Sequence, residues 1–294
     1  GLFHDRGHLG CEWRPVHALT DTGRHGGLYE LHGITAMTEE LLDVVVRKRE
    51  LQGDGVVVLD LTRRDGAPLP GFDAGAHVDI HIGPGLVRQY SLCSDPADSS
   101  LYRLGVLKDP ASRGGSVGVH ETLLEGREVR ISTPRNLFPL AAQARRSILL
   151  GGGIGITPMI AMAHALHQQG ADFELHYCGR SRSRSAFLEA LAAAPFAARV
   201  VTHFDDEDPA QRLDLVAVLG AANPGTHLYT CGPSGFMDWV IEGARQQGYD
   251  DAHIHHEYFQ AEVDTSGGSF EVVAARSGKT VQVQQGQTLT AALR

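Results

Sequence analysis

The sequence predicts a two-domain protein in which an antiparallel β-barrel is followed by an α/β domain with a doubly wound parallel sheet. Short candidate strands separated by turn residues run from residue 41 to about residue 140, a pattern typical of a small antiparallel barrel. From about residue 146 to residue 259, strands alternate with helices, which indicates a parallel sheet covered by helices. A chain of 294 residues is long enough for about two domains.

The barrel region is punctuated by turn sequences such as Asp65-Gly66 and Gly83-Pro84-Gly85. One helix, near Ser116 to Leu124, interrupts its strands. The predicted barrel strands are Leu42–Arg47, Gly55–Leu61, His77–Ile82, Gln89–Leu92, Tyr102–Leu107 and Val129–Ser132.

In the α/β region, apolar strands and helical segments follow one another in turn. The predicted strands are Ser147–Leu150, Phe173–Cys178, Arg199–Phe204, His227–Thr230 and His253–Phe259. The predicted helical segments between them are Pro158–Gln168, Ala186–Ala194, Leu213–Leu219 and Phe236–Gln247.

The two ends of the chain look different from these domains. Residues 1–36 are rich in Gly and His and show no sustained apolar period, so we interpret them as a leader or linker before a natural start at Met37. Alternation at Phe270–Val273 and Thr280–Val283 predicts one hairpin, the beginning of a third domain that the chain does not finish. The expected boundaries are therefore 37–142 for the barrel, 143–262 for the α/β domain and 263–294 for the hairpin.

Composition limits the partners. The net charge of −9 argues against nucleic acid, because phosphate binding draws on clustered Lys and Arg. No apolar run approaches the ~18 residues of a membrane span, and no secretory signal is evident. The four cysteines, Cys11, Cys93, Cys178 and Cys231, form no CxxC pair. They offer no metal site and fit a reducing, cytoplasmic setting.

The most informative motif is the glycine-rich loop at residues 151–158, with the sequence GGGIGITP. It lies between a strand and a helix, where glycines allow close approach to a diphosphate and the helix start attracts anions. Thr157 is expected to cap the helix and Pro158 to be its first residue. A plain strand-to-helix turn explains three consecutive glycines poorly. The loop departs from G-x-G-x-x-G, which disfavours an ordinary Rossmann dehydrogenase.

Three weaker motifs accompany this loop. Residues 88–91 (RQYS) place Arg88 and Tyr90 on one face of a strand, where they can hold a phosphate and cover a planar ligand. Residues 113–116 (RGGS) begin a helix and form a second possible anion site. Residues 231–233 (CGP) follow a parallel strand at the edge where such sheets bind ligands. Taken singly, a surface arginine, an exposed helix cap and a structural cysteine explain these motifs as well.

Together and in this order, the motifs resemble the ferredoxin-reductase superfamily, and more narrowly the phthalate dioxygenase reductase family. A closing Glu-x-Phe at 257–259 completes the set, which spans most of residues 40–294. The resemblance implies an FMN barrel, a pyridine-nucleotide domain and a β-grasp ferredoxin with a plant-type 2Fe–2S cluster. It also implies hydride transfer from NAD(P)H to FMN, then single-electron transfer to an oxygenase or other acceptor, possibly fused.

The resemblance also assigns residues. Ser91, Thr157 and Cys231 would be catalytic, beside the flavin ring and the nicotinamide. FMN would be held by Arg88, Tyr90, Ser91, Lys108, Gly115, Ser116 and Phe259. NAD(P)H would be held by Gly153, Ile154, Gly155, Thr157, Pro158, Arg180, Ser181, Cys231, Gly232 and Pro233.

The chain departs from the family in one respect. A plant-type cluster needs C-x4-C-x2-C and a fourth cysteine, yet no cysteine follows Cys231. We therefore expect the cluster only beyond Arg294. Arg180 and Ser181 leave NADPH open, although the resemblance favours NADH. A stand-alone reductase that releases reduced flavin and a non-catalytic truncated remnant are the remaining alternatives.

Overall fold

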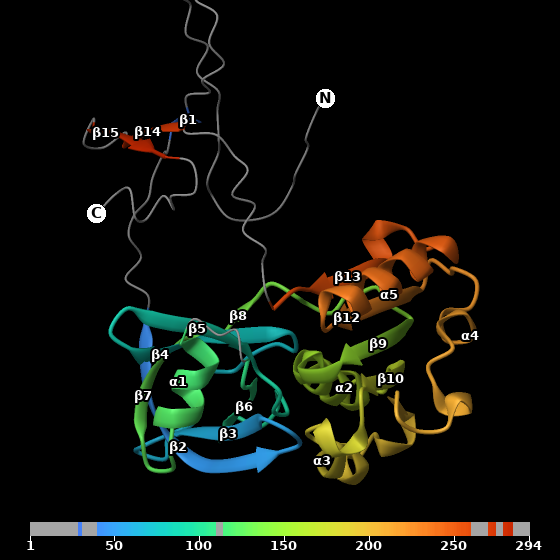
Figure 1. The fold of residues 1–294 in the computed structure, drawn as a ribbon, viewed down its shortest axis with the longest axis horizontal. Coiled ribbons are helices and arrows are strands. Elements are labelled where there is room, and N and C mark those ends of the chain that lie inside the picture. The colour runs from blue at the N-terminus through green and yellow to red at the C-terminus, as the bar shows by residue number, and fades with distance from the viewer. Residues whose placement is uncertain (1–28, 31–39, 110–113, 260–269, 275–278, 285–294) are drawn as a thin grey trace, which may run out of the picture. The chain divides into compact units, whose positions relative to one another are not determined.

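The computed structural model describes residues 29–30, 40–109, 114–259, 270–274 and 279–284 (Figure 1). Residues 39–260 form one compact unit, and residues 1–38 and 261–294 are assigned to another. Within the described residues, no helix combines the length and the apolar character that crossing a membrane requires.

The first half of the large unit is an antiparallel sheet of seven strands. An antiparallel bridge between Leu92 and Leu104 brings the end of β5 to β6 and closes the sheet into a barrel. The helix α1 (Gly115–Thr122) covers one part of it. The strands are β2 (Leu41–Gln52), β3 (Val56–Arg63), β4 (Ala76–Gly83), β5 (Leu86–Ser91), β6 (Tyr102–Leu107), β7 (Glu128–Ser132) and β8 (Arg135–Asn136).

The barrel has an apolar core because its strands alternate in polarity. In β4, for example, Val78 and Ile80 are fully buried in the barrel core, and His77 and Asp79 point to the other face. The cross-strand partners of Val78 and Ile80 on β5 are Tyr90 and Arg88. The predicted shared face of Arg88 and Tyr90 is therefore confirmed, and Ser91 lies on the opposite face of the strand.

The second half is a five-stranded parallel sheet in the order β11-β10-β9-β12-β13. Its strands are β9 (Arg146–Gly152), β10 (Asp172–Gly179), β11 (Val200–Phe204), β12 (Thr226–Cys231) and β13 (Ile254–Glu257). By position along the chain this order is third, second, first, fourth, fifth, which is a doubly wound arrangement. The predicted succession of barrel and parallel sheet is confirmed.

Helices pack on both faces of the parallel sheet. One apolar cluster joins the sheet to α2 (Ile156–Gln168) and α3 (Leu188–Ala193). A second joins its other face to α4 (Leu215–Leu219) and α5 (Ser234–Gln246). Short 3₁₀ turns at Gly153–Gly155, Arg182–Arg184, Ala197–Arg199, Pro209–Gln211 and Asp251–His253 connect these elements.

The predicted start of α2 was wrong. The helix begins at Ile156, so Pro158 is its third residue, and Gly155 occupies the cap position with no side-chain cap. The Thr157 hydroxyl donates to the Ile154 carbonyl at 3.0 Å instead of capping. A proline fits there because the first four N–H groups of a helix have no intrahelical partner.

Other boundaries shifted by a few residues. Gly151 and Gly152 continue β9, whereas β13 stops at Glu257, before the predicted end at Phe259. The short strand β8 was not predicted. The predicted C-terminal hairpin is confirmed as β14 (Phe270–Ala274) and β15 (Lys279–Val283), and β1 (Tyr29–Glu30) pairs with β14.

Candidate active site

The parallel sheet places its candidate site where β9 and β12 end. These neighbouring strands are followed by connections that lead to opposite faces of the sheet. Doubly wound sheets bind ligands in the crevice outside the carboxyl ends of two such strands. The glycine-rich loop follows β9, and Cys231 is the last residue of β12. The two motifs found separately in the sequence therefore meet here.

The glycines at this point allow backbone to approach backbone. A Cβ added to Gly155 would lie 2.2 Å from the Cys231 carbonyl oxygen and 2.6 Å from the Gly232 nitrogen. A Cβ on Gly232 would lie 3.0 Å from Gly152. Gly153 adopts a φ of +54° and faces open space. Gly155 thus lets the loop pack against the backbone at the end of β12, and the space beside Gly153 is open.

Cys231 is a neutral thiol in this arrangement. Its side chain is fully buried, and burial raises the pKa of the thiol, with a further increase from the Glu257 carboxylate. A thiolate is the reactive form of cysteine. Cys231 therefore presents a compact uncharged surface, and Gly232 and Pro233 lead from it into α5.

Glu257 is a site residue that the sequence prediction missed. It lies beside Cys231 in the register of β12 and β13, and its carboxylate accepts a hydrogen bond from the Ser91 hydroxyl at 3.4 Å. Burial raises the pKa of Glu257 to about 7, although the Ser91 bond acts against this shift. The available signal was its place in the Glu-x-Phe motif, because only the fold brings residue 257 to residue 91.

Thr157 joins the glycine-rich loop to the barrel. Its side chain is buried, and a Cβ on Gly105 of β6 would lie 3.0 Å from the Thr157 methyl carbon. The same Cβ would lie 2.7 Å from the ring of Phe187. Because Gly105 has no side chain, the Thr157 and Phe187 side chains of the α/β domain can pack directly against the backbone of β6.

The barrel holds a second glycine-built arrangement. A Cβ on Gly115 would lie 2.7 Å from both Cγ and Nε of Arg88, so the arginine side chain crosses the first residue of α1. Ser116, the next residue of α1, accepts a hydrogen bond from the Asp109 N–H at 3.0 Å. The predicted phosphate-binding residues Arg88, Gly115 and Ser116 thus lie together at the start of the helix.

The other predicted flavin-binding residues come from β5, from the end of β6 and from the segment after β13. Tyr90 is half-buried against the barrel core, and burial raises the pKa of its hydroxyl to about 12. The exposed Lys108 follows β6, with its N–H donating to the Gly55 carbonyl. Phe259 is exposed two residues beyond the end of β13.

The predicted adenosine residues lie where β10 ends. Arg180 is exposed, whereas Ser181 is buried and its hydroxyl lies 3.1 Å from that of Ser183. Within the described residues, the Arg180 guanidinium makes no ion pair. The same ranges contain no group of three or more His, Cys, Asp or Glu side chains suited to a metal ion.

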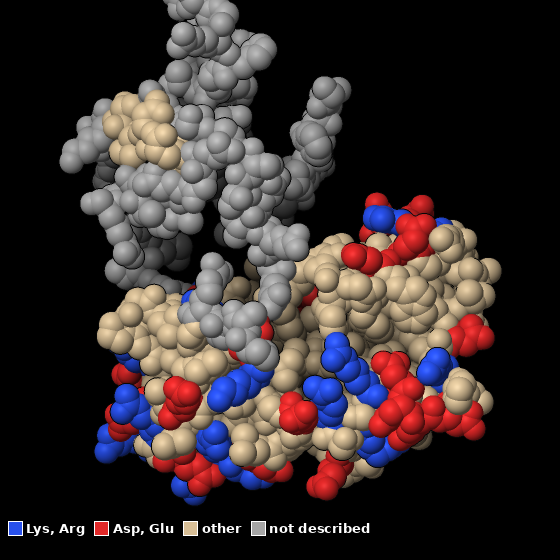
Figure 2. Space-filling model, viewed as in Figure 1, with Lys and Arg blue, Asp and Glu red and all other residues tan. Residues whose placement is uncertain are grey.

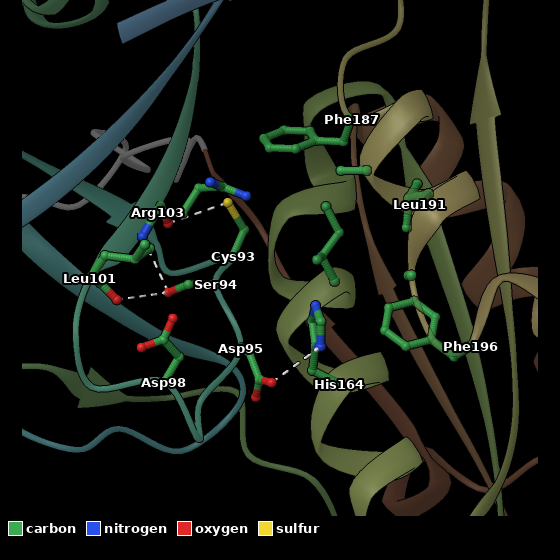
Figure 3. A pocket seen from close by; sticks show the side chains of 13 residues that line it. Cys93, Ser94, Asp95, Asp98, Leu101, Arg103, His164, Phe187, Leu191 and Phe196 are labelled. Carbon is green, nitrogen blue, oxygen red and sulfur yellow. Dashed lines mark hydrogen bonds and ion pairs between the residues drawn. The ribbon is translucent and has the colours of Figure 1, made fainter. Parts of the chain in front are cut away.

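A second set of polar contacts joins the barrel to the α/β domain. Gln168 donates to Asp95 at 2.7 Å, and His164 lies 3.6 Å from the same carboxylate. Asp95 and His164 border a pocket of about 210 Å³ with barrel residues on one wall and Phe187, Leu191 and Phe196 on the other (Figure 3).

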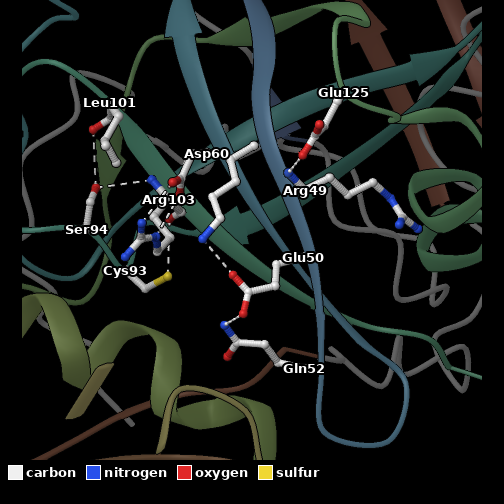
Figure 4. Close-up of polar contacts among 10 residues, drawn as sticks. Arg49, Glu50, Gln52, Asp60, Cys93, Ser94, Leu101, Arg103 and Glu125 are labelled. Atoms are coloured by element: carbon white, nitrogen blue, oxygen red, sulfur yellow. Dashed lines mark hydrogen bonds and ion pairs between the residues drawn. The ribbon is translucent and has the colours of Figure 1, made fainter. Parts of the chain in front are cut away.

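Another polar contact holds Phe187 in place. Its N–H donates to the side-chain oxygen of Gln52 at 2.8 Å, and Glu50 in turn accepts from Gln52 (Figure 4). Phe187 is the non-glycine residue with positive φ, +66°, in the described backbone. A left-handed conformation costs a bulky residue energy, so the Gln52 bond and the packing against Gly105 stabilise a strained residue between the barrel and the α/β domain.

Known proteins share both halves of this arrangement. Residues 131–254 match the family model described as the dimethylamine monooxygenase subunit DmmA-like N-terminal domain. The chain is 48% identical over 255 residues to a vanillate O-demethylase oxidoreductase of Pseudomonas sp. (strain HR199 / DSM 7063), covering 86% of this chain and 80% of that one.

Two solved structures are also similar. Phthalate dioxygenase reductase, described as a modular structure for electron transfer from pyridine nucleotides to 2Fe–2S, matches with a TM-score of 0.72 and 33% identity over 86% of this chain and 79% of that one. An intact type IV self-sufficient cytochrome P450 monooxygenase matches with a TM-score of 0.76 and 38% identity, over 86% of this chain and 33% of that one.

These matches confirm the predicted resemblance. The chain belongs to the phthalate dioxygenase reductase family, the reductase components of oxygenase systems.

Proposed function

We propose that this chain is the NAD(P)H-oxidising, FMN-binding reductase component of an oxygenase system. The observation that carries the proposal is the contact between its two halves. Ser91 of the barrel bonds Glu257, which pairs with Cys231 at the switch point of the parallel sheet. A flavin beside Ser91 and a nicotinamide beside Cys231 would therefore be neighbours.

The barrel residues fit a flavin phosphate. Gly115 has no side chain, so Arg88 lies across the start of α1, and no side chain among the described residues caps that helix. Backbone N–H groups at a helix start and a guanidinium together suit a phosphate. Arg88, Gly115 and Ser116 would hold the FMN phosphate, and Tyr90 and Ser91 would contact the ring.

The residues of the glycine-rich loop fit a dinucleotide. Gly153 leaves open space beside the start of α2, and no side chain among the described residues caps that helix, which leaves the helix start available to an anion. Gly153, Ile154, Gly155 and Pro158 would hold the diphosphate. Cys231, Gly232 and Pro233 would border the nicotinamide, and Arg180 and Ser181 the adenosine.

The side chains at the contact orient the reactants and exclude water. When bound, FMN supplies the chemistry that accepts a hydride from nicotinamide and releases electrons one at a time, while the protein supplies orientation. Glu257, with a pKa of about 7, holds a proton part of the time at neutral pH beside the Ser91 hydroxyl. Thr157 and Cys231 are buried and would exclude water from the reactants.

The residues present do not fit a 2Fe–2S cluster. Plant-type clusters need four cysteine ligands with C-x4-C-x2-C spacing, and the 294 residues contain only Cys11, Cys93, Cys178 and Cys231. The cluster and the oxygenase partner are proposed from the relatives, which include an oxidoreductase of an oxygenase system and a reductase that transfers electrons to 2Fe–2S.

The three cysteines of the compact unit also bear on location. Cys93, Cys178 and Cys231 are free thiols. Reduced thiols fit a reducing compartment, which supports the cytoplasm as the site of action.

The identity of the flavin tests the proposal. The purified chain should show a flavin spectrum that persists through gel filtration, and heat should release FMN, identified by its mass. FAD in place of FMN would remove the assignment of the helix start as a terminal phosphate site. A chain that stays colourless when FMN is supplied would overturn the reductase function, and rapid loss of FMN would favour a reductase that releases reduced flavin.

A further inference from the structure

A run of arginines and a run of acids lie side by side where β10 and β11 end. Arg180, Arg182 and Arg184 follow β10, and the acidic residues 205–208 follow β11. The Asp205 N–H donates to the Gly179 carbonyl at 3.1 Å and the Asp206 N–H to the Arg180 carbonyl at 3.2 Å. These backbone bonds fix the acidic run beside the arginine run. Over the lower part of the α/β domain, Figure 2 shows basic and acidic side chains side by side.

Glu207 engages one of these arginines with both of its oxygens. Arg182 Nε donates to Glu207 Oε1 at 2.9 Å, and the second nitrogen lies 3.4 Å from Oε2. The Arg182 guanidinium also lies over the buried ring of Phe204, 4.6 Å from its centroid. The carboxylate and the ring together hold this guanidinium in one orientation.

The Arg182–Glu207 pair lies where a doubly wound sheet can distinguish NADH from NADPH. In a doubly wound sheet, the second strand ends beside the adenosine ribose, where an acid favours a free 2′-hydroxyl and an arginine accommodates a 2′-phosphate. Here β10 is the second strand, and Arg182 follows it. Arg184 is also engaged, because its Nε lies 3.3 Å from an Asp54 oxygen.

We infer that Glu207 is a coenzyme-selectivity residue, which disfavours NADPH by occupying the Arg182 guanidinium and adding its own negative charge. This inference rests on the proposed function. Asp205, Asp206 and Asp208 add further negative charge to the same loop. A 2′-phosphate entering this site would meet the Glu207 carboxylate and an arginine that is already engaged, whereas a 2′-hydroxyl carries no charge to repel.

Glu207→Gln tests the inference, with Asp208→Asn as the matched control. Asp208 belongs to the same acidic run, but its carboxylate accepts from the Ala210 N–H, a role that asparagine can also fill. The measurement is anaerobic flavin reduction of the full chain by NADH and by NADPH, at one ionic strength because salt screens exposed charges. Wild type should prefer NADH. E207Q should raise the second-order rate constant of flavin reduction by NADPH about ten-fold and change that for NADH less than about two-fold.

A double variant separates a released arginine from a general change in charge. Arg182→Ala in the E207Q background should lose most of the NADPH gain, whereas D208N should show little of it. An unchanged NADH-to-NADPH ratio in E207Q, an equal gain in D208N, or a wild type that prefers NADPH would overturn the inference. Absence of flavin reduction by either coenzyme would instead refute the proposed function.

Discussion

The barrel and the α/β domain both use a glycine to bring two chain segments together, but the glycines have different neighbours. Gly115 makes room for a side chain, that of Arg88, whereas Gly155 makes room for the backbone of Cys231 and Gly232. A side chain can rotate away from an added methyl group, and a strand end cannot. The α/β site is therefore set by backbone geometry, and the barrel site by one arginine whose position is adjustable.

Gly155→Ala should have the largest effect. The new Cβ would lie 2.2 Å from the Cys231 carbonyl oxygen, so the loop or the end of β12 must shift. Because a displacement of about 1 Å can cost about 100-fold in rate, NADH-dependent flavin reduction should fall by about that factor. FMN content should stay at the wild-type level, since the barrel is unchanged.

Gly235→Ala is the matched control for this variant. The same methyl group on Gly235 of α5 would meet nothing within 4 Å. Flavin reduction by NADH should be unchanged. Equal losses of rate in both variants would contradict the backbone explanation.

Arg88→Ala should have the next largest effect, on the barrel side alone. Removing a hydrogen bond to a charged group costs about 1.5–3 kcal/mol, so FMN should bind roughly ten- to a hundred-fold more weakly. Fluorescence titration of the apoprotein with FMN measures this. Arg130→Ala, on β7 of the same barrel, is the control and should bind FMN normally. Unchanged FMN affinity in Arg88→Ala would remove Arg88 from the site.

Gly115→Ala should have a smaller effect of a distinctive kind. The methyl group forces the Arg88 side chain to move, so FMN affinity should fall about ten-fold or less, within the range for one hydrogen bond to a charged group. The Arg88 side chain can move away from the added methyl group, so the free energy of unfolding of the apoprotein should change little. A large loss of stability would show that this glycine, like Gly155, faces backbone that cannot move.

Glu257 links the two sites, and its pH dependence is the smallest predicted effect. Burial raises the pKa of Glu257 from 4.5 to about 7, so the folded state binds this proton more tightly than the unfolded chain does. Its contribution is full below pH about 4.5 and is lost as the pH rises to about 7. The Tm of Glu257→Gln minus that of wild type should therefore increase as the pH is raised from 5 to 8. A constant difference would place the carboxyl pKa in its ordinary range.

Most of the fold could be predicted because its signals are local. Alternation in β4 and the strand-loop-helix pattern at residues 147–168 depend on neighbouring residues. The Ser91–Glu257 bond joins residues 166 positions apart, and its existence depends on how barrel and sheet pack. The same holds for Gly105, whose lack of a side chain matters only because Phe187 and Thr157 lie against it.

The prediction that Thr157 caps α2 was wrong for a related reason. Sequence preference placed it as a helix cap, but the 3₁₀ turn at Gly153–Gly155 starts the helical path earlier and directs its hydroxyl to Ile154. The turn is fixed by the close approach of Gly155 to Cys231, which no local pattern records.

Rapid anaerobic mixing of the FMN-loaded chain with NADH tests the central claim that the two glycine-built sites hold a flavin and a nicotinamide side by side. The wild-type chain should lose its flavin absorbance on mixing, and Gly155→Ala should retain FMN but lose the absorbance about 100-fold more slowly. A wild-type chain that retains FMN and is not reduced by either NADH or NADPH would contradict the account.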